Sequence, residues 1–391
     1  MAHIDPKASR AADRSRILQI DAEIQELEKR LRLLRIERDG PQKRLEAYKY
    51  PVLTLPNEIV SEIFVHTLPL YPACPPLIGP ASPIPLTHIG RKWREIAITT
   101  PQLWRAICVS ACGQGIRRKQ TEVVRTWLDR SKSCPLSIQI EKQKGNHPVL
   151  QEIDLHRERW EQVVTETTGS ALRSFFKGSM PMLRNLSVTM QDDTGVRPAV
   201  SPVDLPRLRR VSLTWFRYPV DWLPCAQLTS LTLNAMHSPN YIPILRHAIH
   251  LVNLTFIGCD LFTRSEAQSQ LDIPLTQLTS LVIVASNVVR VLNLISIPTL
   301  HTLWLSGGDL GDFPMGTLCP LISRCGNGKL RKVLVVGHLS RGVSKKAFRS
   351  AFPTISEISF NSRFRFDARQ EGDEEDSGDS DEEDSDSHSS G

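Results

Sequence analysis

The chain has 391 residues, of which 40% are apolar, and its 48 Lys and Arg residues outnumber its 42 Asp and Glu residues to give a formal charge of +6. The charge is unevenly distributed: residues 371–391 carry eleven acids and no Lys or Arg, which leaves 48 basic against 31 acidic residues, or +17, on residues 1–370. This composition excludes a collagen, a wholly disordered chain and a small disulfide scaffold, and the length predicts two or three domains of roughly 100–200 residues each.

The start of the chain does not resemble a targeting segment. The first apolar residues, from Ile17 onward, are interrupted by charges every few positions, whereas a signal peptide contains a continuous apolar core of about 7–15 residues. No stretch approaches the roughly 18 consecutive apolar residues that a membrane span needs. The eight cysteines are scattered without CxxC spacing. We therefore expect reduced thiols in a cytoplasmic and/or nuclear protein.

Residues 13–50 are predicted to form a charged helix or coiled-coil segment. Its apolar residues are three and four positions apart, as at the a and d positions of a coiled coil: Ile17, Ile20, Ile24, Leu27, Leu31 and Leu34. The pattern fails at Arg38, and Gly40-Pro41 is expected to end the helix because proline lacks the backbone N–H. Fewer than three full heptads is short for an independent dimer. Dimerisation and packing back onto a second segment with Leu45 and Tyr48 therefore both stay open.

Residues 51–110 are predicted to form a small helical domain. After Leu55-Pro56, the side chains of Ile59, Ile63 and Phe64 fall on one face at helical spacing. Residues 69–85 contain seven prolines and are expected to form an extended loop.

A second helix is predicted after this loop. Its apolar face consists of Leu86, Ile89, Trp93, Ile96 and Ala97. Gly90 lies inside this segment, where a glycine costs about 1 kcal/mol relative to alanine. Pro101 is expected to end the helix, and a strand-like run leads from Leu103 to Val109.

Three motifs in this region together resemble an F-box, and more closely the F-box of fungal (mushroom-type) F-box-like proteins. They are Leu55-Pro56-x-Glu58-Ile59 with Ile63-Phe64, then Arg91-Lys92-Trp93-Arg94-x-Ile96-Ala97, and Pro101-x-Leu103-Trp104. The resemblance covers about residues 13–110. The proline-rich insert is long for an F-box, and Gly90 stands where many members have Cys. The resemblance implies docking onto the Skp-type adaptor of a cullin–RING ubiquitin ligase, with apolar contacts from Leu55, Pro56, Ile59, Ile63, Phe64, Ile89 and Trp93.

Residues 111–366 contain a recurring Leu-x-x-Leu-x-Leu pattern. Its eight units begin at Leu183, Leu208, Leu228, Leu251, Leu278, Leu300, Leu330 and Ile355. The units are 20 to 30 residues apart, close to the roughly 20–29 residues of leucine-rich repeats. Short helical pieces are expected between them, at Tyr241–His250 and Asn287–Ile295. The predicted fold class is thus α+β, in which the helical segments precede an α/β leucine-rich-repeat-like solenoid. The alternative is an ordinary α/β domain whose strands recur by chance.

The repeat pattern also predicts a binding surface. Side chains alternate between the two faces of a strand, so the leucines point inward and the intervening residues point to the open face. On that face the later units present Val282, Trp304 and Leu334, an aromatic and aliphatic cluster of the kind that forms binding hot spots. We expect this cluster to bind a protein substrate. The alternative is that an adjacent loop covers Trp304.

Catalysis, metal binding and nucleic-acid binding are not expected. The sequence lacks the phosphate-loop, nucleophile-elbow, zinc-protease and dinucleotide motifs, and His247 and His250 lack a third ligand. No cofactor is therefore predicted. Basic clusters occur at 117–119, at Arg207, Arg209 and Arg210, at Lys329, Arg331 and Lys332, and at 345–346. They lack interleaved aromatic residues, so solvated edges are expected, with an acidic protein partner or the chain's own tail as alternatives.

Residues 367–391 are predicted to form a disordered, acidic and Ser-rich tail, since the segment is too polar to fold. Together these patterns predict a non-catalytic F-box substrate receptor of a Skp–cullin–F-box ubiquitin ligase. In it the F-box would bind the adaptor and the repeats a protein substrate of unknown identity. The alternative is a leucine-rich-repeat scaffold without a ubiquitin-ligase role that dimerises through its N-terminal helix.

Overall fold

The chain forms a mixed α/β structure, represented here by a computed structural model. By their internal contacts its residues divide into two compact units, the first within 1–68 and 78–103 and the second within 69–77 and 104–391. The residues that the structure describes are 6–47, 54–109, 114–141, 148–169, 172, 176, 178–191, 204–217, 220–236, 238–259, 273–284, 292, 295–306, 329–336, 346, 349–350 and 352–361.

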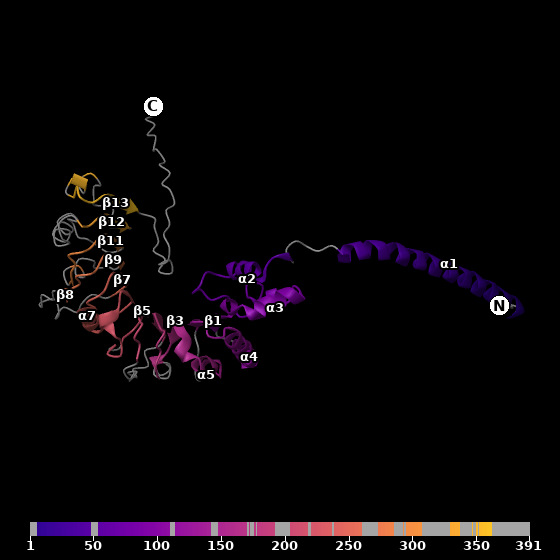
Figure 1. The fold of residues 1–391 in the computed structure, drawn as a ribbon, viewed down its shortest axis with the longest axis horizontal. Coiled ribbons are helices and arrows are strands. Elements are labelled where there is room, and N and C mark those ends of the chain that lie inside the picture. Colours follow the sequence, from indigo (N-terminus) through magenta and orange to yellow (C-terminus); the bar gives the residue numbers. More distant parts are fainter. Residues whose placement is uncertain are drawn as a thin grey trace, which may run out of the picture. The chain divides into compact units, whose positions relative to one another are not determined.

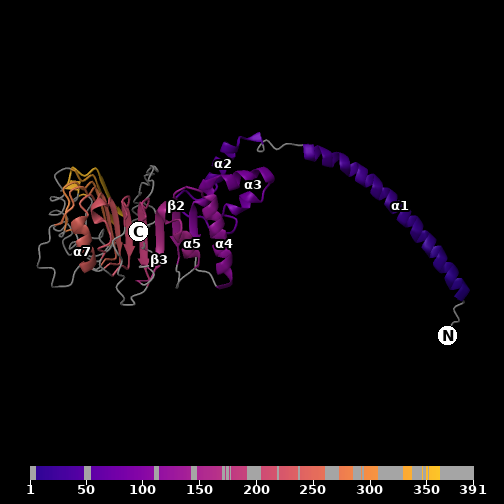
Figure 2. The same cartoon turned by 60° about the horizontal axis from the view of Figure 1, so that its bottom comes forward.

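The N-terminal helix α1 spans Pro6–Ala47 and runs through the predicted stop at Gly40-Pro41 (Figure 2). That prediction was wrong. Proline removes one hydrogen bond locally, but the flanking turns hold the helix, with an ion pair of 2.8 Å between Lys43 Nζ and Asp39 Oδ2 across the proline. Leu45 lies in the same helix with 74% of its surface exposed. The helix therefore does not turn back at this point to cover its own apolar residues.

Two short helices, α2 (Asn57–His66) and α3 (Arg91–Thr99), and the 3₁₀ turns η2 (Ile84–Thr87) and η3 (Pro101–Trp104) follow α1. The core of the α2–α3 region includes Val60, Phe64, Ile96, Ala97 and Leu103. The expectation that the second helix begins near Leu86 was wrong: Leu86 lies in η2, and α3 begins at Arg91 with Gly90 as its N-cap in an extended conformation. A glycine at an N-cap avoids the cost that it has inside a helix.

In the second unit, the described residues contain a parallel sheet of eleven strands that follow one another in the order of the sequence, apart from a separate strand pair. The strands are β1 (Ala106–Val109), β2 (Leu136–Ile140), β3 (Trp160–Thr167), β4 (Asn185–Met190), β5 (Arg210–Thr214), β6 (Ser230–Asn234), β7 (Asn253–Ile257), β9 (Ser280–Val284), β11 (Thr302–Ser306), β12 (Lys332–Val336) and β13 (Glu357–Asn361). The separate pair consists of β8 (Ile273–Pro274) and β10 (Ile295–Ser296).

The sheet is curved, and helices line one side of it. Figure 1 shows the labelled strands along an arc, with α4 (Gln114–Arg130), α5 (Pro148–Asp154) and α7 (Ser238–His247) on its outer side. A parallel pair of neighbouring strands needs a crossover connection, and α4 and α7 lie in such connections. The α7 helix overlaps the helical piece expected at 241–250, whereas most of 287–295 lies outside the described residues.

Each of the eight leucine-pattern units contains one strand of the large sheet: β4, β5, β6, β7, β9, β11, β12 or β13. The second apolar residue of each unit lies in register with its neighbours, from Leu186 beside Val211 to Val333 beside Ile358. These side chains are 0–9% exposed, and the lead residues from Leu183 to Ile355 are 0–6% exposed. The apolar rows therefore form a continuous core behind the sheet.

The sheet begins earlier than the repeat pattern indicates, because β1, β2 and β3 extend it toward the N-terminus. Among the described residues, no helix has the length and apolar character needed to cross a membrane. The acidic tail expected at 367–391 lies outside the described residues.

Candidate functional site

The α2 helix is apolar on two faces. Val60 and Phe64 are each 1% exposed and pack into the core, whereas Ile59 and Ile63 are 49% and 46% exposed. Each pair is four residues apart and so shares one face of the helix. The helix therefore keeps an apolar surface outside the core of its own unit.

The structure separates the seven residues expected to contact an adaptor into surface and core groups. Pro56, Ile59, Ile63 and Ile89 are exposed, Leu55 and Trp93 are half-buried, and Phe64 is buried. The ring centroids of Phe64 and Trp93 are 5.1 Å apart, and Lys92 Nζ donates a hydrogen bond of 3.0 Å to the Leu55 carbonyl oxygen. Phe64 lies in the core although its sequence neighbour Ile63 is exposed, because successive residues of a helix point to different sides of it. It can position the exposed residues, but it is not itself a surface group.

The open face of the sheet carries one unbroken row of side chains in register. From β1 to β13 the row consists of Cys108, Gln139, Val164, Ser187, Ser212, Thr232, Thr255, Val282, Trp304, Leu334 and Ser359. Polar side chains predominate as far as β7. From β9 to β12 the row becomes apolar, so this face changes in chemical character along the sheet.

The three residues expected to bind a substrate are neighbours in this row. Trp304 pairs with Val282 on one side and with Leu334 on the other. Val284 and Val336 lie two residues further along the flanking strands, on the same face. Trp304 and Leu334 are half-buried, while Val282 is only 8% exposed. The predicted cluster is thus assembled, but its accessible part consists mainly of Trp304 and Leu334.

An exposed aromatic residue that was not expected from the sequence, Trp215, lies directly after β5. It is 55% exposed and has a φ of 59°, a left-handed conformation that bulky side chains rarely adopt. Its N–H donates a hydrogen bond of 2.9 Å to the Asn234 carbonyl oxygen. Directly after the next strand, the Ala235 N–H donates an equivalent hydrogen bond of 2.8 Å to the Ile257 carbonyl oxygen. The strand ends therefore hold this ring outside the core. The sequence shows only that Trp215 follows Leu213-Thr214 directly, and this position alone does not predict the exposure of its ring.

The beginning of the proline-rich segment belongs to the sheet unit and contacts its first strands. The Tyr71 hydroxyl donates a hydrogen bond of 2.9 Å to Glu161 Oε2, and the Arg105 guanidinium lies 3.8 Å from the centroid of the Tyr71 ring. Ser137 Oγ donates a hydrogen bond of 2.7 Å to the Pro72 carbonyl oxygen. Burial, followed by the hydrogen bond to Glu161, raises the pKa of Tyr71. These contacts hold residues 71–72 against the sheet, although only a loop was expected there.

Three thiols of this unit are shielded from ionisation. Burial raises the pKa of Cys74 to about 11, that of Cys108 to about 12 and that of Cys225 to about 11. A nucleophilic cysteine needs a lowered pKa because the thiolate is the reactive form. These thiols are therefore poorly suited to covalent chemistry at neutral pH.

The described residues contain no group of three or more His, Cys, Asp or Glu side chains placed to hold a metal ion. The two histidines considered as ligands have separate partners. His247 Nδ1 lies 2.8 Å from the Pro243 carbonyl oxygen, and His250 Nδ1 lies 3.3 Å from Gln277 Oε1.

The basic side chains that the structure describes lie mainly in solvent. Arg207, Arg209 and Arg210 are exposed, and Lys332 Nζ forms an ion pair of 3.1 Å with Glu357 Oε1. Of the cluster at 117–119, only the Lys119 side chain is described, and it is exposed.

Neither the family models nor the curated proteins include a match to this chain.

Proposed function

We propose that this chain is the non-catalytic substrate receptor of a Skp–cullin–F-box ubiquitin ligase. The observation that carries the proposal is the second apolar face of α2, formed by Ile59 and Ile63. Full burial of such a side chain contributes roughly 1.5–3 kcal/mol, so exposed pairs on a short helix favour a protein partner. The F-box resemblance of residues 51–110 implies that this partner would be a Skp-type adaptor.

The adaptor surface would consist of Pro56, Ile59, Ile63 and Ile89, all of which are exposed. Leu55 and Trp93 would contribute their accessible edges. Phe64 would act indirectly, because its contact with Trp93 holds α2 against α3. This assignment refines the expectation from the sequence, in which all seven residues had the same role.

The sheet would hold the substrate. We interpret it as a stack of leucine-rich-repeat-like units, because its strands follow the chain order and its leucine rows are buried. A single such unit cannot bury its apolar face alone, whereas stacked units can. Trp304 and Leu334 would supply the apolar contacts with the substrate. The polar residues of β2 to β6 on the same face would supply hydrogen bonds to it.

The chain would act by bringing two proteins together. If adaptor and substrate bind the same molecule, the substrate meets the ubiquitin-loaded enzyme at a raised effective concentration. This role needs neither a cofactor nor a nucleophile in the chain. It would place the protein in the cytoplasm and/or the nucleus, where such ligases act.

Co-purification tests the proposal. The full chain, co-expressed with a Skp-type adaptor, should retain the adaptor on an affinity column, and Ile59→Asp combined with Ile63→Asp should remove it. Glu62→Gln, at an exposed position of the same helix, is the matched control and should bind normally. Adaptor binding that survives the double substitution would exclude this interface.

The second candidate function is a scaffold without a ligase role. The observation that favours it is the apolar face of α1, which is exposed along its length. A scaffold would dimerise and show no affinity for the adaptor, whereas a receptor binds the adaptor in either oligomeric state. The same co-purification therefore distinguishes the two functions.

A further inference from the structure

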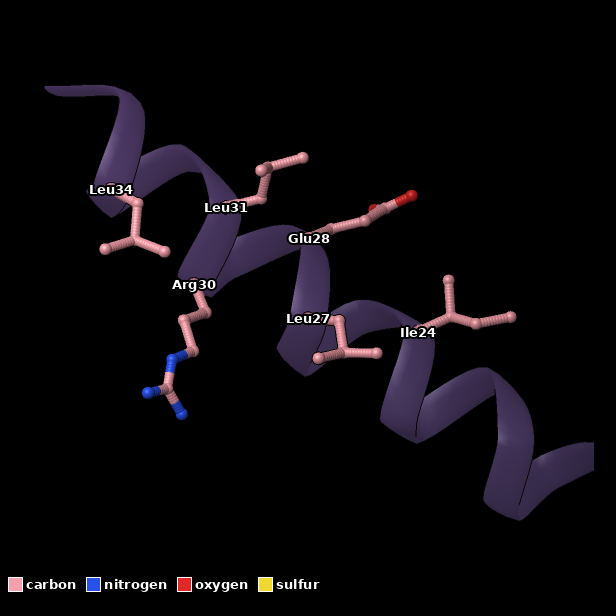
Figure 3. Close-up of a pocket in the computed structure, with 6 residues that line it drawn as sticks. All are labelled: Ile24, Leu27, Glu28, Arg30, Leu31 and Leu34. Atoms are coloured by element: carbon pink, nitrogen blue, oxygen red, sulfur yellow. The ribbon is translucent and has the colours of Figure 1, made fainter. Parts of the chain in front are cut away.

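The apolar face of α1 has no cover in the described part of the chain. Its members are three or four residues apart and 40–59% exposed: Ile17, Ile20, Ile24, Leu27, Leu31 and Leu34. Four of them line a groove together with Glu28 and Arg30. Figure 3 shows the two charged side chains leaving the helix in different directions. A row of apolar residues with charged residues on both sides is the geometry of a coiled-coil seam, in which apolar side chains of one helix enter holes on another.

We propose that a second copy of this chain occupies the seam and that the two α1 helices pair antiparallel. With the pair centred between residues 24 and 27, Ile17 lies opposite Leu34 of the second copy, and Ile20 lies opposite its Leu31. All six apolar residues then find an apolar partner. An in-register parallel pair would match them too, so the apolar residues alone do not fix the direction.

The ends of the seam fix the direction. The heptad that precedes Ile17 places Asp13 on the seam, and the heptad that follows Leu34 places Arg38 there. Both side chains are exposed. In the antiparallel pair Asp13 meets Arg38 of the second copy at each end. In the parallel pair Asp13 would meet Asp13 and Arg38 would meet Arg38, which places like charges together at both ends.

The charges beside the seam also favour the antiparallel pair. In the antiparallel pair two contacts with the second copy are attractive, Glu23 with Arg30 and Arg16 with Glu37. Two others are repulsive, Asp21 with Glu28 and Arg14 with Arg35. In the parallel pair Arg16 faces Asp21, but Glu23 faces Glu28 and Arg30 faces Arg35. Opposite charges at these flanking positions select partner and orientation. The antiparallel pair therefore has more attractive contacts for the same number of repulsive ones.

Sedimentation equilibrium of the full chain tests the occupant. The wild-type chain should dimerise, and Leu27→Asp should weaken the dimer at least tenfold by placing a carboxylate in the apolar seam. Leu33→Asp is the control, since Leu33 is 60% exposed but lies off the seam. A wild-type monomer at all concentrations, or a dimer that is unaffected by Leu27→Asp, would overturn the proposal.

A charge reversal tests the direction. Glu23→Arg should weaken an antiparallel dimer about fivefold, because the introduced guanidinium would face Arg30 of the second copy, and adding Arg30→Glu should restore it. In a parallel dimer Glu23→Arg would instead bring the new positive charge beside Glu28 and tighten the dimer. Tightening would overturn the antiparallel arrangement. Failure of adaptor binding would leave this inference intact, because it rests on α1 alone.

Discussion

The α2–α3 region and the sheet differ in how completely they bury their apolar residues. The sheet buries both leucine rows of its eight repeated units to 9% exposure or less, while α2 leaves Ile59 and Ile63 about half exposed. A stack of strands supplies each apolar row with neighbours on both sides. Two short helices have too little surface to cover both faces of α2. The leucine rows of the sheet are therefore covered by their own neighbours, whereas the helical region has apolar surface available for a partner.

The largest expected effect comes from removing the ring that joins the two helices. Phe64→Ala leaves a cavity beside Trp93 and should lower the free energy of unfolding of this region by about 4 kcal/mol. Hydrogen exchange of the α2 and α3 amides should accelerate accordingly, with Ile63→Ala as the exposed neighbouring control. Unchanged exchange would show that the region is not held by this contact.

The corresponding change in the sheet is Leu231→Ala. Leu231 is fully buried between Val211 and Leu254, and its truncation should cost about 3 kcal/mol. Urea denaturation measures this loss, and Thr232→Ala on the open face of the same strand should stay within about 0.5 kcal/mol of wild type. Equal costs for the two substitutions would contradict the assignment of a buried and an open face.

Contact with β2 should also protect the Cys74 thiol, whose Sγ lies 3.6 Å from Ser137 Oγ. The pKa of Cys74 is about 11 instead of 9.0, so at pH 8 its alkylation should be about 100-fold slower in the native chain than in the denatured chain. Mass spectrometry can follow this residue separately. Because the folded-state pKa is the higher one, the stability associated with Cys74 is complete below pH 9 and declines as the pH rises toward 11. Equal alkylation rates would contradict the burial of Cys74.

The smallest effect on stability is expected from the surface of α2. Ile59→Asp combined with Ile63→Asp should cost about 2 kcal/mol, well below the loss for Phe64→Ala, because each side chain is already about half exposed and lies outside the core. Thermal unfolding measures this. A large loss would show that the exposed face is structural, and it would remove the contrast with Phe64.

The sequence was most informative where its pattern repeats. The spacing of units such as Leu228-Leu231-Leu233 located the strands β4 to β7, β9 and β11 to β13, because each inward-facing position must be apolar in a parallel stack. It failed at β2 and β3, whose sequences do not follow the pattern. The prediction that Gly40-Pro41 ends the first helix was also wrong, because the cost of a proline in a helix is local and the hydrogen bonds of the flanking turns can offset it.

Site residues were predicted less completely than strands. Spacing placed Ile59, Ile63 and Phe64 on one face, but it could not distinguish the side that faces α3 from the side that faces solvent. Val282, Trp304 and Leu334 were grouped correctly, since strand alternation and register determine the open face. The exposure of Trp215 depends on a left-handed backbone after β5 that no local pattern encodes.

The central claim is that the exposed face of α2 binds a Skp-type adaptor. Hydrogen exchange of the full chain with and without saturating adaptor tests it most directly. We predict protection of residues 57–66 and of the segment around Ile89 when the adaptor is bound, and unchanged exchange in β9 to β12. An adaptor that binds without protecting α2, or that does not bind at all, would contradict this claim.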